Sequence, residues 1–300
     1  MLFSPWEIDF CKSIQTGSAL LMENIGYYNG RTGLIEDMMI PMNDRACYFG
    51  DGVYDATCCK NNVIYLIEDH LDRFFNSAGL LRIDLPFTKS ELADILNDLV
   101  RKVDADEKFV YWQSSRGTAK RNHLFPGTKA NLYITVTPAP LPDLSKPIQL
   151  ITVEDTRFLH CNIKTLNLIP SVMAAQQADE AGCQEAVLHR GDRVTECAHS
   201  NVSILKNGMF ITAPTDHLIL PGIARMHLIR ACKKLCIPVD ETPFTLDDLR
   251  NADEIIVSSS SKFALFADQL DGKPAGGRAP ALLKAIQDEV MREFHAYVGA

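Results

Sequence analysis

The sequence Asn162-Ile163-Lys164-Thr165-Leu166-Asn167-Leu168-Ile169 is mostly apolar and carries one lysine, Lys164, near its middle. A lysine in such a run can extend its ammonium out of the core or meet a carboxylate, because lysine is rarely buried without a partner. A partly desolvated lysine can instead act as a nucleophile that forms Schiff bases. The second role requires other groups from the chain: a phosphate site, a carboxylate for a ring nitrogen, and a cation for a substrate carboxylate.

The composition limits the class of protein. The chain has 300 residues, of which 46% are hydrophobic and 23% are charged, as in soluble globular proteins with one large or two medium domains. The net charge of -8 argues against nucleic acid and anionic membranes as partners, because each would require a basic surface. No apolar run reaches the ~18 residues of a membrane span. Met1 to Leu20 also lacks the cationic start and apolar block of a secretory signal.

The cysteines favour a reducing compartment. Nine cysteines occur, which is an odd number, and no two of them form a Cys-x-x-Cys pair. Disulfides and structural zinc are therefore not expected, and we predict no metal site. We expect a cytoplasmic protein.

A proline-rich segment divides the chain. Residues 139–147 contain three prolines, which exclude helix and the interior of a sheet. We therefore expect an N-terminal domain over 1–138, a linker over 139–147 and a C-terminal domain over 148–300.

Helix and strand signals occur on both sides of this linker. A helix with acids in its first turn opens at Ile67, and Thr88 with Glu91 forms a capping box before an amphipathic helix. Asn207-Gly208 predicts a hairpin between two short strands. Further helices are expected at 172–180, 226–236 and 280–297.

A phosphate site can be built from three features. Gly222-Ile223-Ala224 precedes a predicted helix, and free amides at a helix N-terminus bind phosphate. Arg73 could add charge, and the serines at 258–261 could add hydroxyl groups. Taken singly, these features are more typical of a turn, a surface ion pair and an exposed loop.

A carboxylate and an anion receptor are also available. Glu196 lies between two predicted strands, and a buried carboxylate beside a pyridine nitrogen keeps that nitrogen protonated. Arg121 and His123 lie two positions apart in a cationic loop, so both can approach one substrate carboxylate. Each of these residues alone is more typical of a solvated loop, and their joint occurrence with Lys164 carries the argument.

Six sequence motifs follow one another between about Gly26 and Ser261. They are Tyr48-Phe49-Gly50-Asp51-Gly52-Val53-Tyr54, His70-Leu71-Asp72-Arg73, Arg116-Gly117-Thr118 with Arg121-x-His123, Ile163-Lys164-Thr165-Leu166-Asn167, Glu185-Ala186-Val187-Leu188 with Val194-Thr195-Glu196 and Ser200-Asn201-Val202, and Gly222-Ile223-x-Arg225. In these motifs, in register, the chain resembles the fold type IV pyridoxal-phosphate enzymes, and among them most resembles the bacterial D-amino-acid aminotransferases.

The resemblance implies a fold and a cofactor site. The fold would be α+β or α/β with two domains: a small α/β N-terminal domain and a larger C-terminal domain with a β-barrel-like core. Pyridoxal 5′-phosphate would lie at the domain interface, in a Schiff base with Lys164 and with its ring nitrogen at Glu196. The remaining implied cofactor residues are Arg73, the amides of Ile223 and Ala224, Ser260, Arg157 near the cofactor, and Leu220 on the ring face.

The resemblance also implies how substrate is bound. Tyr54, Arg121 and His123 would hold the substrate carboxylate, and the last two would come from the partner in a homodimer with a shared active site. Ala224 stands where the family usually has threonine, a missing hydroxyl contact worth on the order of 1 kcal/mol. His199 stands where small residues are usual, so it would narrow the substrate pocket or contact substrate.

The implied reaction is transamination from a D-amino acid such as D-alanine to a 2-oxo acid such as 2-oxoglutarate, with Lys164 as general base. Branched-chain L-amino-acid aminotransferases and aminodeoxychorismate lyases share the fold and stay open as alternatives. Both usually lack the Arg-x-His pair, which favours the D-specific reading here. A non-catalytic binding protein of the same fold is a further alternative.

Overall fold

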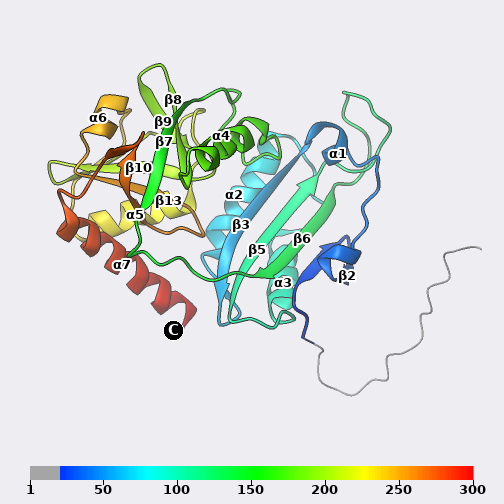
Figure 1. Cartoon of the computed structure of the whole chain (residues 1–300). Helices are drawn as coiled ribbons and strands as arrows, with labels where there is room; N and C mark the ends of the chain where they lie inside the picture. Colours follow the sequence, from blue (N-terminus) through cyan, green and yellow to red (C-terminus); the bar gives the residue numbers. More distant parts are fainter. Residues whose placement is uncertain (1–20, 300) are drawn as a thin grey trace, which may run out of the picture.

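The computed structural model describes residues 21–299, and two β-sheets form its framework. Figure 1 shows the two sheets side by side, each with its own helices. Strands that end by Pro138 form the first sheet, strands from Ile148 onward form the second, and residues 139–147 connect them. The expectation that no secretory signal is present concerns residues 1–20, which lie outside the described part of the chain.

The first sheet has six antiparallel strands in the order β2-β1-β6-β5-β3-β4. The turn between its first two strands contains Asn29 and Gly30, both with positive φ, as the Asn-Gly pair predicted. Its strands are β1 (Ile25–Tyr28), β2 (Arg31–Gly33), β3 (Gly52–Lys60), β4 (Val63–Ile64), β5 (Glu107–Ser115) and β6 (Asn131–Pro138). Its helices are the 3-10 helix Ile35–Asp37, α1 (Arg45–Phe49), α2 (Ile67–Leu80) and α3 (Lys89–Val100).

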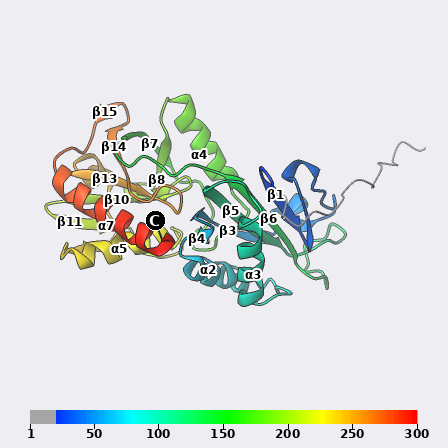
Figure 2. The same cartoon turned by 90° about the horizontal axis from the view of Figure 1, so that it is seen from below.

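Helices α2 and α3 cover one face of this sheet, as both views show (Figures 1 and 2). Their apolar residues recur every three or four positions, so one side of each helix packs against the strands. The predicted capping box is confirmed: Thr88 Oγ1 accepts from the Glu91 amide at 3.2 Å, and the Glu91 carboxylate accepts from the Thr88 amide at 2.7 Å.

The second sheet has nine strands, eight of them in the order β12-β11-β10-β13-β14-β7-β8-β9, with β15 paired to β14. The sheet curls. Strand β9 lies at one end of the strand order and β10 lies near the other end, yet only the three residues 198–200 connect them, so the two ends must lie close together. The strands are β7 (Ile148–Glu154), β8 (Glu185–Arg190), β9 (Arg193–Cys197), β10 (Asn201–Lys206), β11 (Met209–Thr212), β12 (Val239–Asp240), β13 (Glu254–Ser258), β14 (Leu265–Leu270) and β15 (Lys273–Pro274).

Four helices pack on the second sheet: α4 (Ile169–Glu180), α5 (Ile223–Lys234), α6 (Leu246–Arg250) and α7 (Pro280–Val298). Helices α5 and α7 share a core with β10, β11 and β13, whereas α4 packs on β7 and β8. The hairpin predicted at Asn207-Gly208 joins β10 to β11. Within residues 21–299, no helix combines the length and apolar character needed to cross a membrane.

Three differences from the sequence expectations have local causes. Helix α4 begins at Ile169 rather than 172, because Pro170 fits the first turn of a helix. Helix α5 begins at Ile223 rather than 226, directly after the extended N-cap Gly222. The short helix α1 was not predicted, although Asp44 caps it by accepting from the Ala46 amide at 2.7 Å.

The stretch around Lys164 connects β7 to α4 and crosses to the first sheet. Thr165 pairs with Val53 in an isolated antiparallel bridge, and the Tyr54 amide donates to the Lys164 carbonyl at 3.0 Å. The stretch is therefore not a core strand of its own sheet. It fastens the second sheet to strand β3 of the first.

Candidate active site

A cavity of ≈ 390 Å³ is lined by residues from both halves of the chain, a volume typical of small-molecule sites. Strand β3, helix α2 and strand β5 line it from the first sheet's side. Of the residues singled out by the sequence, it brings together Tyr54, Arg73, Arg157, Lys164, Glu196, His199, Leu220, Ile223, Ala224 and Ser260. Arg121 and His123 do not line it within the described chain.

Lys164 is fixed by its backbone. Its amide donates to Ser77 Oγ of α2 at 3.2 Å, while its carbonyl accepts from the Tyr54 amide of β3. The Lys164 Nζ atom lies 4.1 Å from the centre of the Tyr54 ring. An amine so placed, half-buried and resting on an aromatic face, is available to a molecule in the cavity.

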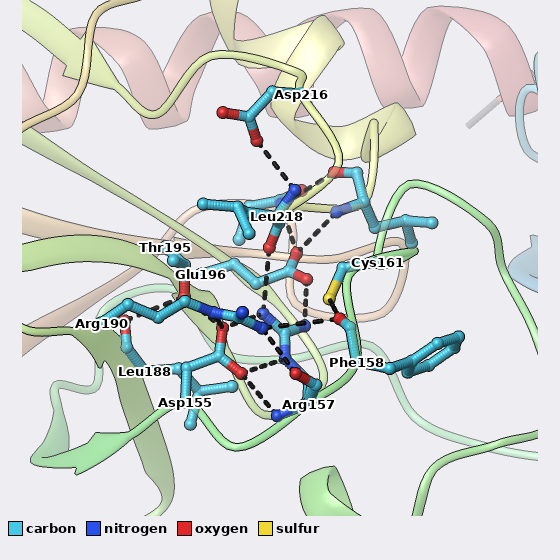
Figure 3. A network of polar contacts seen from close by, with 12 residues as sticks. Asp155, Arg157, Phe158, Cys161, Leu188, Arg190, Thr195, Glu196, Asp216 and Leu218 are labelled. Atoms are coloured by element: carbon cyan, nitrogen blue, oxygen red, sulfur yellow. Dashed lines mark hydrogen bonds and ion pairs between the residues drawn. The ribbon is translucent and has the colours of Figure 1, made fainter.

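Glu196 on β9 is buried and held by three donors (Figure 3). Its carboxylate forms an ion pair with Arg157, accepts from Asn201 Nδ2 at 2.9 Å and accepts from the Leu220 amide at 3.1 Å. Burial raises the pKa of Glu196 to about 7, against the lowering effect of the Arg157 guanidinium. A positively charged ring nitrogen beside this carboxylate would favour its ionised form.

Arg157 is in turn positioned by Asp155, which the sequence analysis did not single out. Asp155 accepts two hydrogen bonds from the Arg157 guanidinium, from Nε and Nη2 at 2.9 Å each, and one from Arg190 Nε at 3.1 Å (Figure 3). Burial alone would raise the pKa of Asp155, but Arg157 and Arg190 lower it to about 2. A carboxylate two positions before Arg157 was the available sequence signal.

Arg73 stands at the other end of the cavity, on a buried polar chain. Its Nε and Nη2 donate to the Asp55 carboxylate at 2.9 and 2.6 Å, and its Nη1 donates to the Pro221 carbonyl at 3.3 Å. Burial would raise the pKa of Asp55, but Arg73 and His70 hold it well below its usual value. Burial lowers the pKa of His70, so its neutral ring donates to Asp55 and can accept from Ser260 Oγ at 3.2 Å.

The N-terminus of α5 is an open anion site beside Arg73. Within the described residues no side chain caps its first turn, so the amides of Ile223 and Ala224 stay available. Gly222 is required by close packing, because an added Cβ would lie 1.9 Å from Asn201 Oδ1. Ser258, which also lines the cavity, has a buried hydroxyl without a hydrogen-bond partner in the part of the chain that the structure describes.

Arg121 and His123 lie on the loop between β5 and β6, next to the ring of Phe49. The Arg121 guanidinium lies 5.2 Å from the centre of the Phe49 ring, and the His123 ring centre is also 5.2 Å from it. Arg45 holds the loop by donating to the Asn122 carbonyl at 2.6 Å. Both side chains belong to exposed residues, so they face away from the cavity of their own chain.

Comparison with known proteins identifies the family. Residues 52–269 match the family Amino-transferase class IV. The chain is 38% identical over 260 residues to a D-alanine aminotransferase of Listeria monocytogenes serotype 4b (strain F2365), covering 84% of this chain and 90% of that protein. It is 35% identical to a D-alanine aminotransferase of Staphylococcus aureus (strain MSSA476), covering 89% and 96%.

Solved structures of the same family have the same fold. The branched-chain aminotransferase from Thermoproteus uzoniensis, solved with norvaline, aligns with a TM-score of 0.83 at 22% identity over 92% of this chain and 97% of that one. The branched-chain aminotransferase from Escherichia coli aligns with a TM-score of 0.82 at 22% identity over 93% and 96%. These likenesses confirm the predicted fold type IV, including the curled second sheet.

The cofactor of class IV aminotransferases is pyridoxal 5′-phosphate, and the cavity residues fit it. The α5 amides and the Ser258 hydroxyl, which are free of side-chain caps or partners among the described residues, match a phosphate together with Arg73. The buried carboxylate of Glu196 matches a protonated ring nitrogen, and the amine of Lys164 matches the aldehyde. Ala224 keeps its amide here, so its missing hydroxyl removes one contact and not the site.

Gly222→Ala should weaken cofactor binding. The added methyl must displace Asn201 or the α5 turn, so affinity for pyridoxal phosphate should fall about 10-fold or more, from the loss of at least one charged-group hydrogen bond. Titration of the cofactor-free chain with pyridoxal phosphate, followed by absorbance, measures this affinity. Gly79→Ala is the matched control, because an added Cβ there meets open space. Equal affinity in both variants would contradict the role of Gly222 and the α5 amides in binding the phosphate.

Glu196→Gln should alter how stability depends on pH. The folded pKa of about 7 exceeds the ordinary 4.5, so the stabilising contribution of Glu196 is complete below pH 4.5 and disappears as pH rises through 7. In the cofactor-free chain, the variant should therefore gain on the order of 2 kcal/mol relative to wild type between pH 5 and 8. Urea unfolding at both pH values tests this, with the exposed Glu180→Gln as control. A constant difference would refute it.

Proposed function

This chain belongs to the class IV aminotransferase family, and on that premise we propose that it transfers the amino group of D-amino acids to 2-oxo acids. The observation that carries this proposal is the meeting of Lys164, Glu196 and the α5 amides in one cavity. D-Alanine is the expected donor type, because relatives that are 35% and 38% identical over most of the chain are named D-alanine aminotransferases. 2-Oxoglutarate is the expected acceptor type.

Lys164 is the proposed proton carrier. Pyridoxal phosphate, when bound, supplies a carbonyl carbon that takes up the amino group and a ring that accepts the electron pair left at Cα. The Lys164 amine would remove the Cα proton as a general base and, as a general acid, deliver it to the cofactor carbon that carries the amino group. Its backbone contacts to Ser77 and Tyr54 hold the amine on one side of the cavity, which selects one of the two Cα faces.

Glu196 and Arg73 are proposed to hold the two ends of the cofactor. Glu196 keeps a negative charge where a protonated ring nitrogen is required, and Arg157, Asn201 and the Leu220 amide keep that carboxylate from turning away. Arg73, fixed by Asp55, offers its guanidinium to the phosphate. Leu220 lines the cavity where it can pack on the ring face.

We propose that the substrate carboxylate is bound by Tyr54 together with Arg121 and His123 of a partner subunit. Tyr54 lines the cavity, whereas Arg121 and His123 point outward from a loop held by Arg45. A second copy of the chain is therefore needed to bring them to a cavity. This arrangement favours D-amino acids because it fixes the carboxylate on one side of Cα relative to Lys164.

Exposed apolar side chains support a homodimer. Met42 is 90% exposed and Leu124 is 75% exposed, and the guanidinium of Arg45, three positions after Met42, contacts the Leu124 carbonyl. Met39 and Phe125 are also exposed apolar residues, and Phe125 belongs to the same loop as Arg121. Surfaces of this kind are typical of protein interfaces, and two-fold dimers are the commonest assembly.

A reducing compartment, the cytoplasm, is also proposed. The eight described cysteines are free. Burial raises the pKa of Cys58 to about 12 and that of Cys59 to about 11, so these neighbouring thiols stay protonated and unreactive. Cys161 and Cys197 line the cavity, where oxidation would obstruct it.

The holoenzyme should convert D-alanine and 2-oxoglutarate to pyruvate, and L-leucine should not react. Lys164→Ala should abolish turnover, because no other described lysine in the cavity approaches Tyr54. A coupled assay for pyruvate measures the turnover of D-alanine by wild type and by Lys164→Ala. A panel of D- and L-amino acids measures the preference for one enantiomer. Fast turnover of L-leucine together with no turnover of D-alanine would favour the branched-chain alternative. Repeated release of pyruvate from aminodeoxychorismate without an acceptor, with no turnover of D-alanine, would favour a lyase.

Mixed dimers should test the shared site. Lys164→Ala lacks the amine, and the double variant Arg121→Ala/His123→Ala lacks the carboxylate trap, so each alone should be inactive. Refolding them together should restore about a quarter of wild-type activity, because half of the dimers then contain one intact site. Refolding each variant with itself is the control. If mixed dimers form but stay inactive, Arg121 and His123 do not bind the substrate carboxylate in the site of the partner subunit.

A further inference from the structure

Three polar side chains meet at the cavity wall without a part in the chemistry described above. Glu185 begins β8, His199 lies in the 198–200 connection, and Lys262 follows β13. Glu185 Oε2 lies 2.8 Å from Lys262 Nζ and 2.5 Å from His199 Nδ1, and it accepts from Ser200 Oγ at 2.9 Å. Lys262 and the adjacent residues His199 and Ser200 thus converge on one carboxylate oxygen of Glu185.

Glu185 is the fixed member of this cluster. Its side chain is fully buried. Burial alone would raise the pKa of Glu185, but His199 and Lys262 lower it to about 2. It therefore stays ionised at neutral pH and anchors both basic groups.

Lys262 and His199 are the members that reach the cavity. Both line it, and Lys262 is the more enclosed, with its side chain 20% exposed against 54% for His199. An ammonium group has three N–H donors, and Glu185 accepts one of them. Lys262 can therefore meet a second carboxylate without leaving the first.

The other cations of the cavity wall already have proposed roles at the cofactor. Arg73 is paired with Asp55 beside the phosphate site, and Arg157 lies between Asp155 and Glu196. Lys164 carries the proposed reactive amine. Among the described residues that line the cavity, Lys262 is thus the lysine or arginine left to recognise substrate.

We propose that Lys262, anchored by Glu185 with His199 beside it, binds the distal carboxylate of dicarboxylic substrates. D-Glutamate and D-aspartate would then serve as donors beside D-alanine, and the same lysine would hold the distal carboxylate of the expected acceptor, 2-oxoglutarate. This inference rests on the proposed transamination and assigns a binding residue for its dicarboxylic substrates. The physical basis is a charge-assisted hydrogen bond in a partly desolvated site, where such bonds are stronger than in water.

The half-reaction of the holoenzyme with a single donor tests this assignment. Lys262→Met keeps the side-chain length but removes the charge. Its second-order rate constant with D-glutamate should fall about 10- to 100-fold, the loss expected for one hydrogen bond between charged groups. Its rate constant with D-alanine should stay within about two-fold, because D-alanine has no distal carboxylate. The absorbance change of the cofactor reports both.

Lys206→Met is the matched control, since Lys206 forms an equivalent ion pair with Asp248 outside the cavity and should change neither rate. Equal losses with both donors, or no loss with either, would overturn the assignment. If Lys262→Met fails to fold, Lys262→Gln takes its place. On wild type, glutarate should inhibit at least about 10-fold more tightly than butyrate, and equal inhibition would count against the site.

Failure of the proposed function would look different. In that case wild type would react with neither D-alanine nor D-glutamate. That result would reject transamination itself, independently of the Lys262 variants. Reaction of wild type with D-alanine, together with an unchanged donor ratio in Lys262→Met, would leave transamination standing and remove only the role of Lys262.

Discussion

The burial of the Glu196 carboxylate is the constraint on which the site depends. Removing an anion from water is unfavourable unless charges and hydrogen bonds replace the solvent. Arg157, Asn201 and the Leu220 amide supply these contacts, and each comes from a different segment around the cavity. The curled sheet, the turn before α5 and the β7–α4 connection must therefore assemble together. A cation bound at the open side of the Glu196 carboxylate would further offset the free-energy cost of burying its charge.

The same device recurs around the cavity wall. Asp55, Asp155 and Glu185 are fully buried side chains, and each presents a basic group toward the cavity: Arg73, Arg157 and Lys262 respectively. Pairing keeps each cation charged and in one orientation, which a flexible surface lysine or arginine would not achieve. Binding groups that are fixed before the ligand arrives lose less conformational entropy when it binds.

The sequence predicted the residues that reach the cavity better than the residues that hold them. Lys164, Glu196 and Gly222 stand in recognisable local patterns, and their meeting in one cavity agrees with the expectation. Asp155 has a partner two positions away and could have been found. The pair of Glu185 and Lys262 could not, because 77 positions separate the two residues and the fold alone brings them together.

The fold was likewise predicted in outline but not in its details. Periodicity and capping located α2 and α3, whereas α1 is too short for a periodic signal. The path of the Lys164 stretch along β3 depends on a contact between the two sheets, which no local pattern records. Arg121 and His123 lie outside the cavity of their own chain, so their role depends on a second subunit.

The central claim is that Lys164 is the residue that binds the cofactor covalently. The most direct measurement is reduction of the holoenzyme with borohydride, followed by proteolysis and mass mapping of the chain. The account predicts a pyridoxyl-phosphate group on the peptide that contains Lys164 and on no other peptide. A label on a different lysine, or no label on a chain shown to be folded and incubated with excess cofactor, would contradict it.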